Sequence, residues 1–419
     1  MDTIGQDKIM IKGEIPLRGK INLQSSPYLT NFFITLALFC GSDITLKGSF
    51  FDNLVQKYIR SLDASGLTLR NYADTLLIPR TVDFWRSTYI SELDSINKYI
   101  FLVSLKKQGF AEIKENAELV DFFRYLGYVI EDSKERYIVY NKVKLNKNSI
   151  TFYKPNLEYF LISILVFLLN YDTFTISISD LNYEMSLLLE DFKNLKIVKD
   201  ITYSNFVNIH FDVKDLEKKL GAEVVIPRDP NEFIFFCAAS MATGGEVEIV
   251  GVNPKTFSSS LKLFTDMGAG YDALSTDTIR VWGTKRDSLN GISVLDQSTC
   301  LNFTKLCLLP IISVAKKSNE DYFKIFLNYE ENKSLIQDLN RLGASLNIEE
   351  DTIIAREVGQ IKSDTLYLEK GKEESNYVKV LAGLLCKERM EFFDSKHLRI
   401  YNSSVFDKLQ VLGAEINGL

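Results

Sequence analysis

The chain has 419 residues, of which 46% are hydrophobic and 25% are charged, a composition typical of a folded globular protein. Its net charge of −6 argues against a nucleic-acid-binding protein, which normally carries a basic face. An anionic small-molecule substrate is not excluded, because an acidic protein can carry a local cationic cleft. The length favours two domains of about 200 residues each.

The sequence shows no sign of a membrane span, a metal site or a disulfide framework. Its longest apolar stretch, residues 160–169, is about half as long as a bilayer requires. The first residues, MDTIGQDKIMIKGEIPL, lack the apolar core of a secretion signal, so we expect a cytoplasmic protein. The five cysteines show no CxxC spacing, and the chain has only two histidines. This pattern favours buried free thiols over metal ligands.

A short motif returns six times along the chain: an apolar helix end closed by Leu-Gly or its equivalent and followed by a strand. Successive copies lie roughly 60 to 75 residues apart, and repetition at such a period indicates a fold built from repeated units. The copies are LDASGLTL (62–69), FRYLGYVI (123–130), FKNLKIV (192–198), FTDMGAGY (264–271), LNRLGASL (339–346) and LQVLGAEI (409–416). The third copy contains no glycine.

The fourth repeat shows the order of elements most clearly. Residues 223–226 and 246–250 alternate as strands, and residues 231–242 form a nearly all-apolar helix that a Gly-Gly pair ends. A second helix is predicted over residues 256–266. A helix that is apolar on every side must be buried on every side. We therefore predict an α/β protein with buried helices and outer sheets, in which three repeats surround one helix core.

Four stretches resemble the enolpyruvyl transferase family, whose members act on 3-phosphoshikimate or on UDP-N-acetylglucosamine. These stretches are residues 13–53, 224–269, 292–312 and 381–416, and the resemblance covers essentially the whole chain. It implies two inside-out α/β domains of (βαβαββ)3 organisation, joined by a double hinge. One domain is expected to span 20–222, and the other to combine 1–19 with 223–419.

The resemblance also implies a reaction. The family transfers the enolpyruvyl (1-carboxyvinyl) group from phosphoenolpyruvate to a hydroxyl with release of phosphate, and needs no metal or organic cofactor. The order of DP, GGEVEI and NPKT in residues 224–269 is similar to the branch that acts on shikimate 3-phosphate in the shikimate pathway of aromatic amino acid biosynthesis. The branch that acts on UDP-N-acetylglucosamine is the alternative. Two anionic substrates require several arginines and lysines, and proton transfer requires a carboxylate and a lysine.

Four residues of the first three repeats fall where the resemblance implies substrate binding. Ser26 and Asn31 match an anion site at the start of the first buried helix, whose lysine and arginine are not matched. Lys98 and Lys114 stand in the places of two substrate-binding arginines. A lysine keeps the charge but loses the fork that grips a phosphate or carboxylate bidentately. In the third repeat, Glu158 stands in the place of a polar triplet, where its carboxylate is expected to repel a phosphate.

The second half of the chain holds one catalytic candidate. Asp296 falls where the family has a catalytic aspartate at the mouth of a buried helix, and an ordinary N-cap is the alternative role. Ile400 takes the place of a family lysine, with Arg399 beside it. Two further cationic places fall in residues 328–332 and 372–377, which contain no arginine.

The functional prediction therefore keeps three alternatives. The first is a divergent transferase that uses phosphoenolpyruvate and shikimate 3-phosphate or another small hydroxyl acceptor. The second is a non-catalytic family member that acts as a binding or regulatory partner of another protein. The third is transfer to an uncharged acceptor, which needs fewer cations. The lost cations oppose the first, because each charge-assisted hydrogen bond contributes about 1.5–3 kcal/mol.

Overall fold

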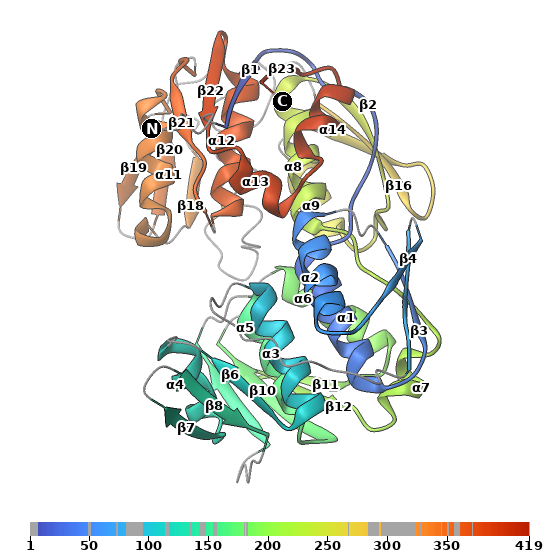
Figure 1. Ribbon diagram of the computed structural model, residues 1–419. Helices are drawn as coiled ribbons and strands as arrows, with labels where there is room; N and C mark the ends of the chain where they lie inside the picture. The colour runs from blue at the N-terminus through green and yellow to red at the C-terminus, as the bar shows by residue number, and fades with distance from the viewer. Residues whose placement is uncertain are drawn as a thin grey trace. The chain divides into compact units, whose positions relative to one another are not determined.

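The structure is a computed structural model of the chain (Figure 1). It describes residues 7–48, 52–72, 74–80, 95–113, 117–133, 136–141, 148–153, 157–179, 181, 183–266, 268–283, 293–294, 323–326, 329–344, 346–349, 352–355, 361–370 and 372–418. The chain divides into two compact units. The middle unit is Ser25–Pro227, and the terminal unit combines Met1–Gln24 with Arg228–Leu419.

The middle unit alternates helices and short strands. Its helices are α1 (Pro27–Cys40), α2 (Asn53–Ala64), α3 (Ser95–Gln108), α4 (Ala117–Tyr125), α5 (Leu157–Leu168), α6 (Tyr183–Asn194) and α7 (Leu216–Leu220). Its strands are β3 (Ile44–Lys47), β4 (Arg70–Tyr72), β5 (Thr75–Ile78), β6 (Phe110–Ile113), β7 (Val129–Ser133), β8 (Arg136–Tyr140), β9 (Ser149–Phe152), β10 (Thr173–Ile178), β11 (Val198–Tyr203), β12 (Val207–Asp212) and β13 (Glu223–Val225).

The terminal unit repeats this alternation. Its helices are α8 (Pro230–Thr243), α9 (Ser258–Asp266), α11 (Tyr329–Arg341), α12 (Glu373–Leu385), α13 (Lys396–Tyr401) and α14 (Val405–Val411). Its strands are β1 (Lys8–Lys12), β2 (Arg18–Asn22), β14 (Glu246–Val250), β15 (Gly270–Ala273), β16 (Thr278–Trp282), β17 (Ser293–Val294), β18 (Phe323–Phe326), β19 (Leu346–Glu349), β20 (Thr352–Ala355), β21 (Thr365–Tyr367), β22 (Arg389–Phe393) and β23 (Glu415–Asn417).

The sheets of both units share one strand order. In the sheet β11-β12-β10-β9, the antiparallel pairs β11–β12 and β12–β10 are followed by the parallel pair β10–β9. The sheets β4-β5-β3-β13, β15-β16-β14-β2 and β19-β20-β18-β17 have the same order. In the sheet β23-β1-β22-β21, the first strand of the chain takes the second place, between strands from the end of the chain.

Three helices form the core of the middle unit. Helices α1, α3 and α5 pack pairwise, and most residues of α1 and α5 are buried. The sheets cover this core with their alternating apolar faces: Phe174 of β10 stacks on Phe167 of α5 with 5.2 Å between ring centroids. Lys98 and Glu158 bring the amino ends of α3 and α5 together, and one cavity touches the last turns of α1, α3 and α5. The three helices therefore run parallel.

The terminal unit is organised around α8 and α12. All residues of α8 from Pro230 to Ala242 are buried, and α8 packs on α12, where Phe235 and Tyr377 lie 4.8 Å apart between ring centroids. The predicted inside-out α/β architecture, with buried helices and outer sheets, is confirmed. No helix in the described ranges combines the length and hydrophobicity that crossing a bilayer requires.

The six sequence motifs form six copies of one turn. The second residue after the helix of each motif has a positive φ, between 58° and 101°. Two backbone bonds close each turn; in the first copy, the N–H groups of Gly66 and Leu67 donate to the carbonyls of Asp63 and Leu62. This pattern is the Schellman motif, in which a left-handed residue satisfies the last carbonyls of a helix. The six left-handed residues are Gly66, Gly127, Lys196, Gly268, Gly343 and Gly413.

Candidate functional site

The amino ends of α3 and α5 hold a lysine–glutamate pair. Lys98 Nζ lies 3.2 Å from Glu158 Oε1, and the two side chains are 15% and 17% exposed. Glu158 Oε1 is buried without a hydrogen bond among the described residues, so the contact is an ion pair that lacks hydrogen-bond geometry. The ammonium group also lies 5.2 Å from the ring centroid of Tyr159, which adds a cation–π attraction. The charge of Lys98 is therefore compensated from two sides.

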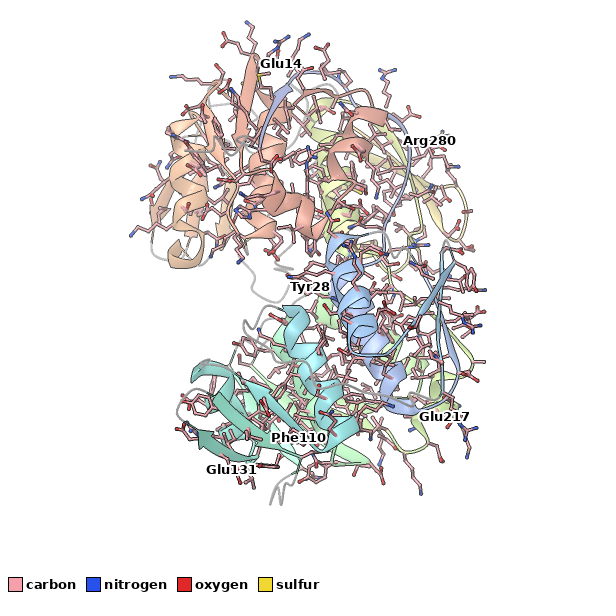
Figure 2. All side chains as sticks on the ribbon, viewed as in Figure 1. Glu14, Tyr28, Phe110, Glu131, Glu217 and Arg280 are labelled. Carbon is pink, nitrogen blue, oxygen red and sulfur yellow. The ribbon has the colours of Figure 1, made fainter. Side chains whose placement is uncertain are left out.

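Two further tyrosines lie at the same end of the helix core. Tyr99 is fully buried, and its hydroxyl has no hydrogen-bond partner within the described part of the chain. Burial raises the pKa of Tyr99 well above its ordinary value, and the nearby Glu158 carboxylate and the Tyr58 and Tyr28 phenols raise it further. Tyr28 lies at the start of α1 (Figure 2). The phenol of Tyr99 is therefore neutral, and it can donate or accept a hydrogen bond.

Ser26 and Asn31 lie on the first helix of this core. Ser26 is the N-cap residue of α1, with an extended backbone, but its side chain makes no capping bond. The Ser26 Oγ and Asn31 Oδ1 atoms are both buried, and neither has a partner among the residues that the structure describes. A buried polar atom without a partner costs about 1–3 kcal/mol. These two atoms therefore favour a bound polar group or water near the start of α1.

The electrostatics of this helix end differ from those of an ordinary anion site. The amino end of a helix carries a partial positive charge that favours anions. Here Glu158 itself supplies a carboxylate to the first turn of α5, and its partner Lys98 is already paired. The described side chains thus offer hydroxyl groups and aromatic rings but no uncompensated cation. We call Ser26, Tyr28, Lys98, Tyr99, Glu158 and Tyr159 the helix-end cluster.

The terminal unit also buries a lysine–glutamate pair, at the start of α8. Glu232 is fully buried and forms an ion pair with Lys408 of α14. Its Oε2 accepts a 2.7 Å bond from the Gln24 backbone N–H, and its Oε1 accepts a 2.9 Å bond from Asn402. The same Asn402 amide donates to the Tyr377 hydroxyl over 3.0 Å. Both carboxylate oxygens are therefore satisfied, which indicates a structural role.

Asp229 lies beside this network as the N-cap residue of α8. Its side chain accepts a 2.8 Å bond from the backbone N–H of Asn231. Burial, and then the neighbouring Glu232 carboxylate, raise the pKa of Asp229 to about 7. A carboxyl group with such a pKa binds and releases a proton near neutral pH. Full burial nevertheless separates Asp229 from a dissolved substrate.

Arg399 lies in α13 of the terminal unit, with its guanidinium carbon 5.5 Å from the ring centroid of Phe406. It is thus packed on an aromatic ring at a half-buried position. Two other predicted site residues, Asp296 and Lys114, lie outside the described residues. Of the predicted residues, the structure brings Ser26, Asn31 and Lys98 to two packed helices, α1 and α3.

A cavity of about 410 Å³ lies at the opposite, carboxyl ends of the middle unit's helices. Cys40, Lys106 and Leu168 line it together with residues of α7. Burial, and then the Glu217 carboxylate, raise the pKa of the Cys40 thiol to about 12, so this thiol is not a ready nucleophile. Within the described ranges, no three His, Cys, Asp or Glu side chains are grouped for a metal ion.

Sequence reasoning missed several members of these clusters. Glu158 was expected to repel phosphate, but its pairing with Lys98 was not predicted. Glu232 and Lys408 were not singled out, and neither was Tyr99. An available signal is an acidic residue in the first turn of an otherwise apolar helix, which holds for Glu158 in α5 and for Glu232 in α8. Such a carboxylate needs a cationic or hydrogen-bonded partner once the helix is buried.

Comparisons with known proteins give a consistent result. The sequence model of EPSP synthase (3-phosphoshikimate 1-carboxyvinyltransferase) matches residues 117–371, more than half of the chain. UDP-N-acetylglucosamine 1-carboxyvinyltransferase of Chlorobium luteolum is 29% identical over 179 residues, which are 43% of this chain and 41% of that protein. UDP-N-acetylglucosamine 1-carboxyvinyltransferase 3 of Symbiobacterium thermophilum is 24% identical over 205 residues, which are 49% of this chain and 47% of that protein. The match thus spans less than half the length of these curated relatives.

Solved structures resemble the chain over almost its whole length. The enolpyruvyl transferase NikO of Streptomyces tendae has a TM-score of 0.72 at 14% identity, over 98% of both chains. EPSP synthase of Acinetobacter baumannii has a TM-score of 0.70 at 13% identity, over 98% of this chain and 99% of that one. At such identities the likeness shows the fold alone, and the match of the sequence model shows the family. The chain belongs to the enolpyruvyl transferase family.

Proposed function

We propose that the chain transfers the enolpyruvyl group of phosphoenolpyruvate to a hydroxyl of a small acceptor and releases phosphate. The observation that carries the proposal is the family match over residues 117–371. Shikimate 3-phosphate and UDP-N-acetylglucosamine are the first acceptors to test, because the matched family and the curated relatives are named for them. The fold similarity over 98% of the chain supports the presence of both domains that such an enzyme needs.

The proposed reaction makes one bond and breaks another. The acceptor oxygen bonds to C2 of phosphoenolpyruvate while a proton is added to the C3 methylene group. The C2–O bond to phosphate then breaks, and C3 loses a proton, which restores the double bond. The protein must therefore remove the hydroxyl proton and exchange a proton at C3. Asp296 stays our prediction for a carboxylate in these steps, and Lys98, Lys114 and Arg399 stay predictions for substrate binding.

The test is a phosphate-release assay with phosphoenolpyruvate and each acceptor, with mass spectrometry to detect the carboxyvinyl product. Release that requires both substrates is the expected result. Lys98→Met is expected to lower the rate, because it changes the ion pair at the helix-end cluster. The matched control is Lys193→Met, which removes an exposed lysine at the end of α6 in the same unit. No phosphate release with any acceptor at high protein concentration would contradict the proposal.

A second candidate is a non-catalytic protein that binds a partner. One observation favours it: Glu158 compensates the charge of Lys98, so this lysine is not available to an anionic substrate. In this case calorimetry would detect no binding of phosphoenolpyruvate, and the protein would co-purify with another protein. Turnover by the isolated chain would exclude this candidate.

A further inference from the structure

A cavity of about 410 Å³ lies at the carboxyl ends of the helices that form the core of the middle unit. It is bordered by residues at or just after the last turns of α1, α3 and α5 and by the short helix α7. Ser26 and Lys98 lie at the opposite, amino ends of α1 and α3, so this cavity is separate from the helix-end cluster. Sites for small molecules usually have volumes of about 300–1,000 Å³. The cavity is therefore large enough to hold one small ligand.

Apolar and aromatic side chains supply part of the cavity wall. Phe39 of α1 and Tyr171, which follows α5, contribute two half-buried aromatic rings. Leu168, Val213 and Leu216 add aliphatic groups. Walls of this kind stabilise the apolar part of a ligand by removing it from water. The wall therefore favours a ligand with an apolar or aromatic group.

Charged groups of both signs border the same cavity. Lys106, in the last turn of α3, forms no ion pair within the described ranges. The carboxylates of Asp172 and Glu217 also lack an ion pair among the residues that the structure describes. Asp215 and Lys218 instead pair with each other over 3.5 Å. The described wall thus leaves charges of both signs available to a ligand.

The available charges lie close to one atom of the wall. Burial raises the pKa of the Cys40 thiol; the Glu217 carboxylate raises it further, whereas the Lys106 ammonium group lowers it. Both charges therefore lie within electrostatic range of the same thiol. The carboxyl end of a helix carries a partial negative charge that favours a cation, and α1, α3 and α5 all end here. The helix ends thus add to the attraction of the carboxylates for an ammonium group.

We propose that this cavity binds a zwitterion with an apolar side chain, namely a free α-amino acid of the phenylalanine or leucine type. The carboxylate of the ligand pairs with Lys106, and its ammonium group pairs with Asp172 and Glu217. Its side chain contacts the rings of Phe39 and Tyr171. A ligand with only one charge leaves one side of this arrangement without a partner. The inference concerns binding alone and does not rest on the proposed function.

A matched series of ligands tests the inference on the natural protein by isothermal titration calorimetry. L-Phenylalanine is expected to bind. Phenylalaninamide lacks the carboxylate and 3-phenylpropionate lacks the ammonium group, so each should bind about fivefold more weakly, as the loss of one partly exposed charge pair predicts. Glycine keeps both charges without an apolar side chain, and it should also bind more weakly than L-phenylalanine.

Variants of the charged wall assign each contact. Lys106→Met should weaken binding of L-phenylalanine about fivefold and abolish the discrimination against phenylalaninamide. The double variant Asp172→Asn/Glu217→Gln should abolish the discrimination against 3-phenylpropionate. The matched controls are Lys107→Met and Glu190→Gln, which remove exposed charges that do not line the cavity. Both controls should bind L-phenylalanine as the natural protein does.

Three results would overturn the inference. The first is equal affinity of the natural protein for L-phenylalanine and its two analogues, and the second is unchanged affinity in both variants of the charged wall. The third is no detectable binding of L-phenylalanine or L-leucine. The first and third results are obtained with the natural protein, so they do not depend on whether a variant folds.

Discussion

The two units of the molecule bury the same pair of residue types with different consequences. In the terminal unit, Glu232 is fully buried, and its two oxygens accept bonds from Lys408, Asn402 and the Gln24 backbone. In the middle unit, Glu158 has an ion pair with Lys98, and both side chains keep some exposure. A carboxylate whose bonds are complete fixes the fold, whereas one with a single ionic partner can exchange that partner for a ligand. The contrast predicts a structural role for the terminal pair and a functional role for the middle pair.

The largest expected effect is at the terminal pair. Lys408→Met leaves the buried Glu232 carboxylate without its cation, and breaking a buried ion pair in this way costs about 3 kcal/mol of unfolding free energy. Urea unfolding followed by circular dichroism measures the loss. Lys98→Met is the matched change in the middle unit, where the Glu158 side chain is 17% exposed and can be hydrated in part, so the cost should be smaller, about 1–2 kcal/mol. Equal losses at the two sites would remove the contrast.

A second prediction concerns pH and Asp229. The folded-state pKa of about 7 lies above the ordinary value, so the folded state binds the proton more tightly than the unfolded state does. This stabilisation is present below the unfolded-state pKa near 4 and is lost as pH rises to 7. Asp229→Asn keeps an N-cap acceptor and removes the titration.

The natural protein should therefore lose stability relative to the variant as the pH rises from 5 to 8. The difference in unfolding free energy between the two proteins should change by on the order of 2 kcal/mol. Urea unfolding at the two pH values checks this difference. A parallel pH dependence of the two proteins would show that Asp229 is not protonated in the folded state. Within the terminal unit, the result would distinguish the titrating Asp229 from the neighbouring Glu232, whose carboxylate is paired with Lys408.

A third prediction compares the turns of the two units. Lys196 in the middle unit has a φ of 58°, whereas its counterpart Gly413 in the terminal unit has a φ of 96°. A side chain in this left-handed region costs roughly 1 kcal/mol. Gly413→Ala should lose about 1 kcal/mol of stability, although an added Cβ has open space there, and Lys196→Gly should gain up to about 0.5 kcal/mol after the entropic cost of glycine. Thermal unfolding should show a lower melting temperature for Gly413→Ala and a higher one for Lys196→Gly than for the natural protein.

The smallest expected effect is on stability at Glu158. Glu158→Gln should change the unfolding free energy by less than about 1 kcal/mol, because the pair is partly exposed and lacks hydrogen-bond geometry. Glu232→Gln is its counterpart and should cost more, since the fully buried carboxylate and its bonds to Lys408 and Asn402 would be replaced by those of a neutral amide. A large loss for Glu158→Gln in thermal unfolding would assign the middle pair a structural role as well.

Local sequence pattern was sufficient for much of the fold. The nearly all-apolar helix predicted at 231–242 is α8, Pro230–Thr243, and the six motifs form six equivalent turns. Both features depend on neighbouring residues, whose periodicity and turn chemistry can be read directly. The glycine-free copy was also recognised, because its apolar positions stay in place around Lys196.

The site was less predictable, because its contacts join distant segments. Lys98 and Glu158 were assigned separately, and only the parallel packing of α3 and α5 makes them partners. The partner of Glu232, Lys408, lies 176 positions away. A charge that appears unpaired in the sequence can therefore be neutralised by a residue of another repeat. The roles predicted for Asp296 and Lys114 stay predictions, since both residues lie outside the described part of the chain.

The place of β1 has a consequence for the order in which the protein forms. This strand, Lys8–Lys12, is hydrogen-bonded between β22 and β23, so its register is set by residues 389–393 and 415–417. During synthesis from the amino end, β1 leaves the ribosome well before its partners β22 and β23. The middle unit has all its strands within Ser25–Pro227. It can therefore fold before the partners of β1 have been synthesised. Pairing between strands so far apart in the sequence is slow, and until it forms the unpaired β1 can pair with other chains. The terminal unit is therefore the part of this protein that we expect to depend most on a chaperone.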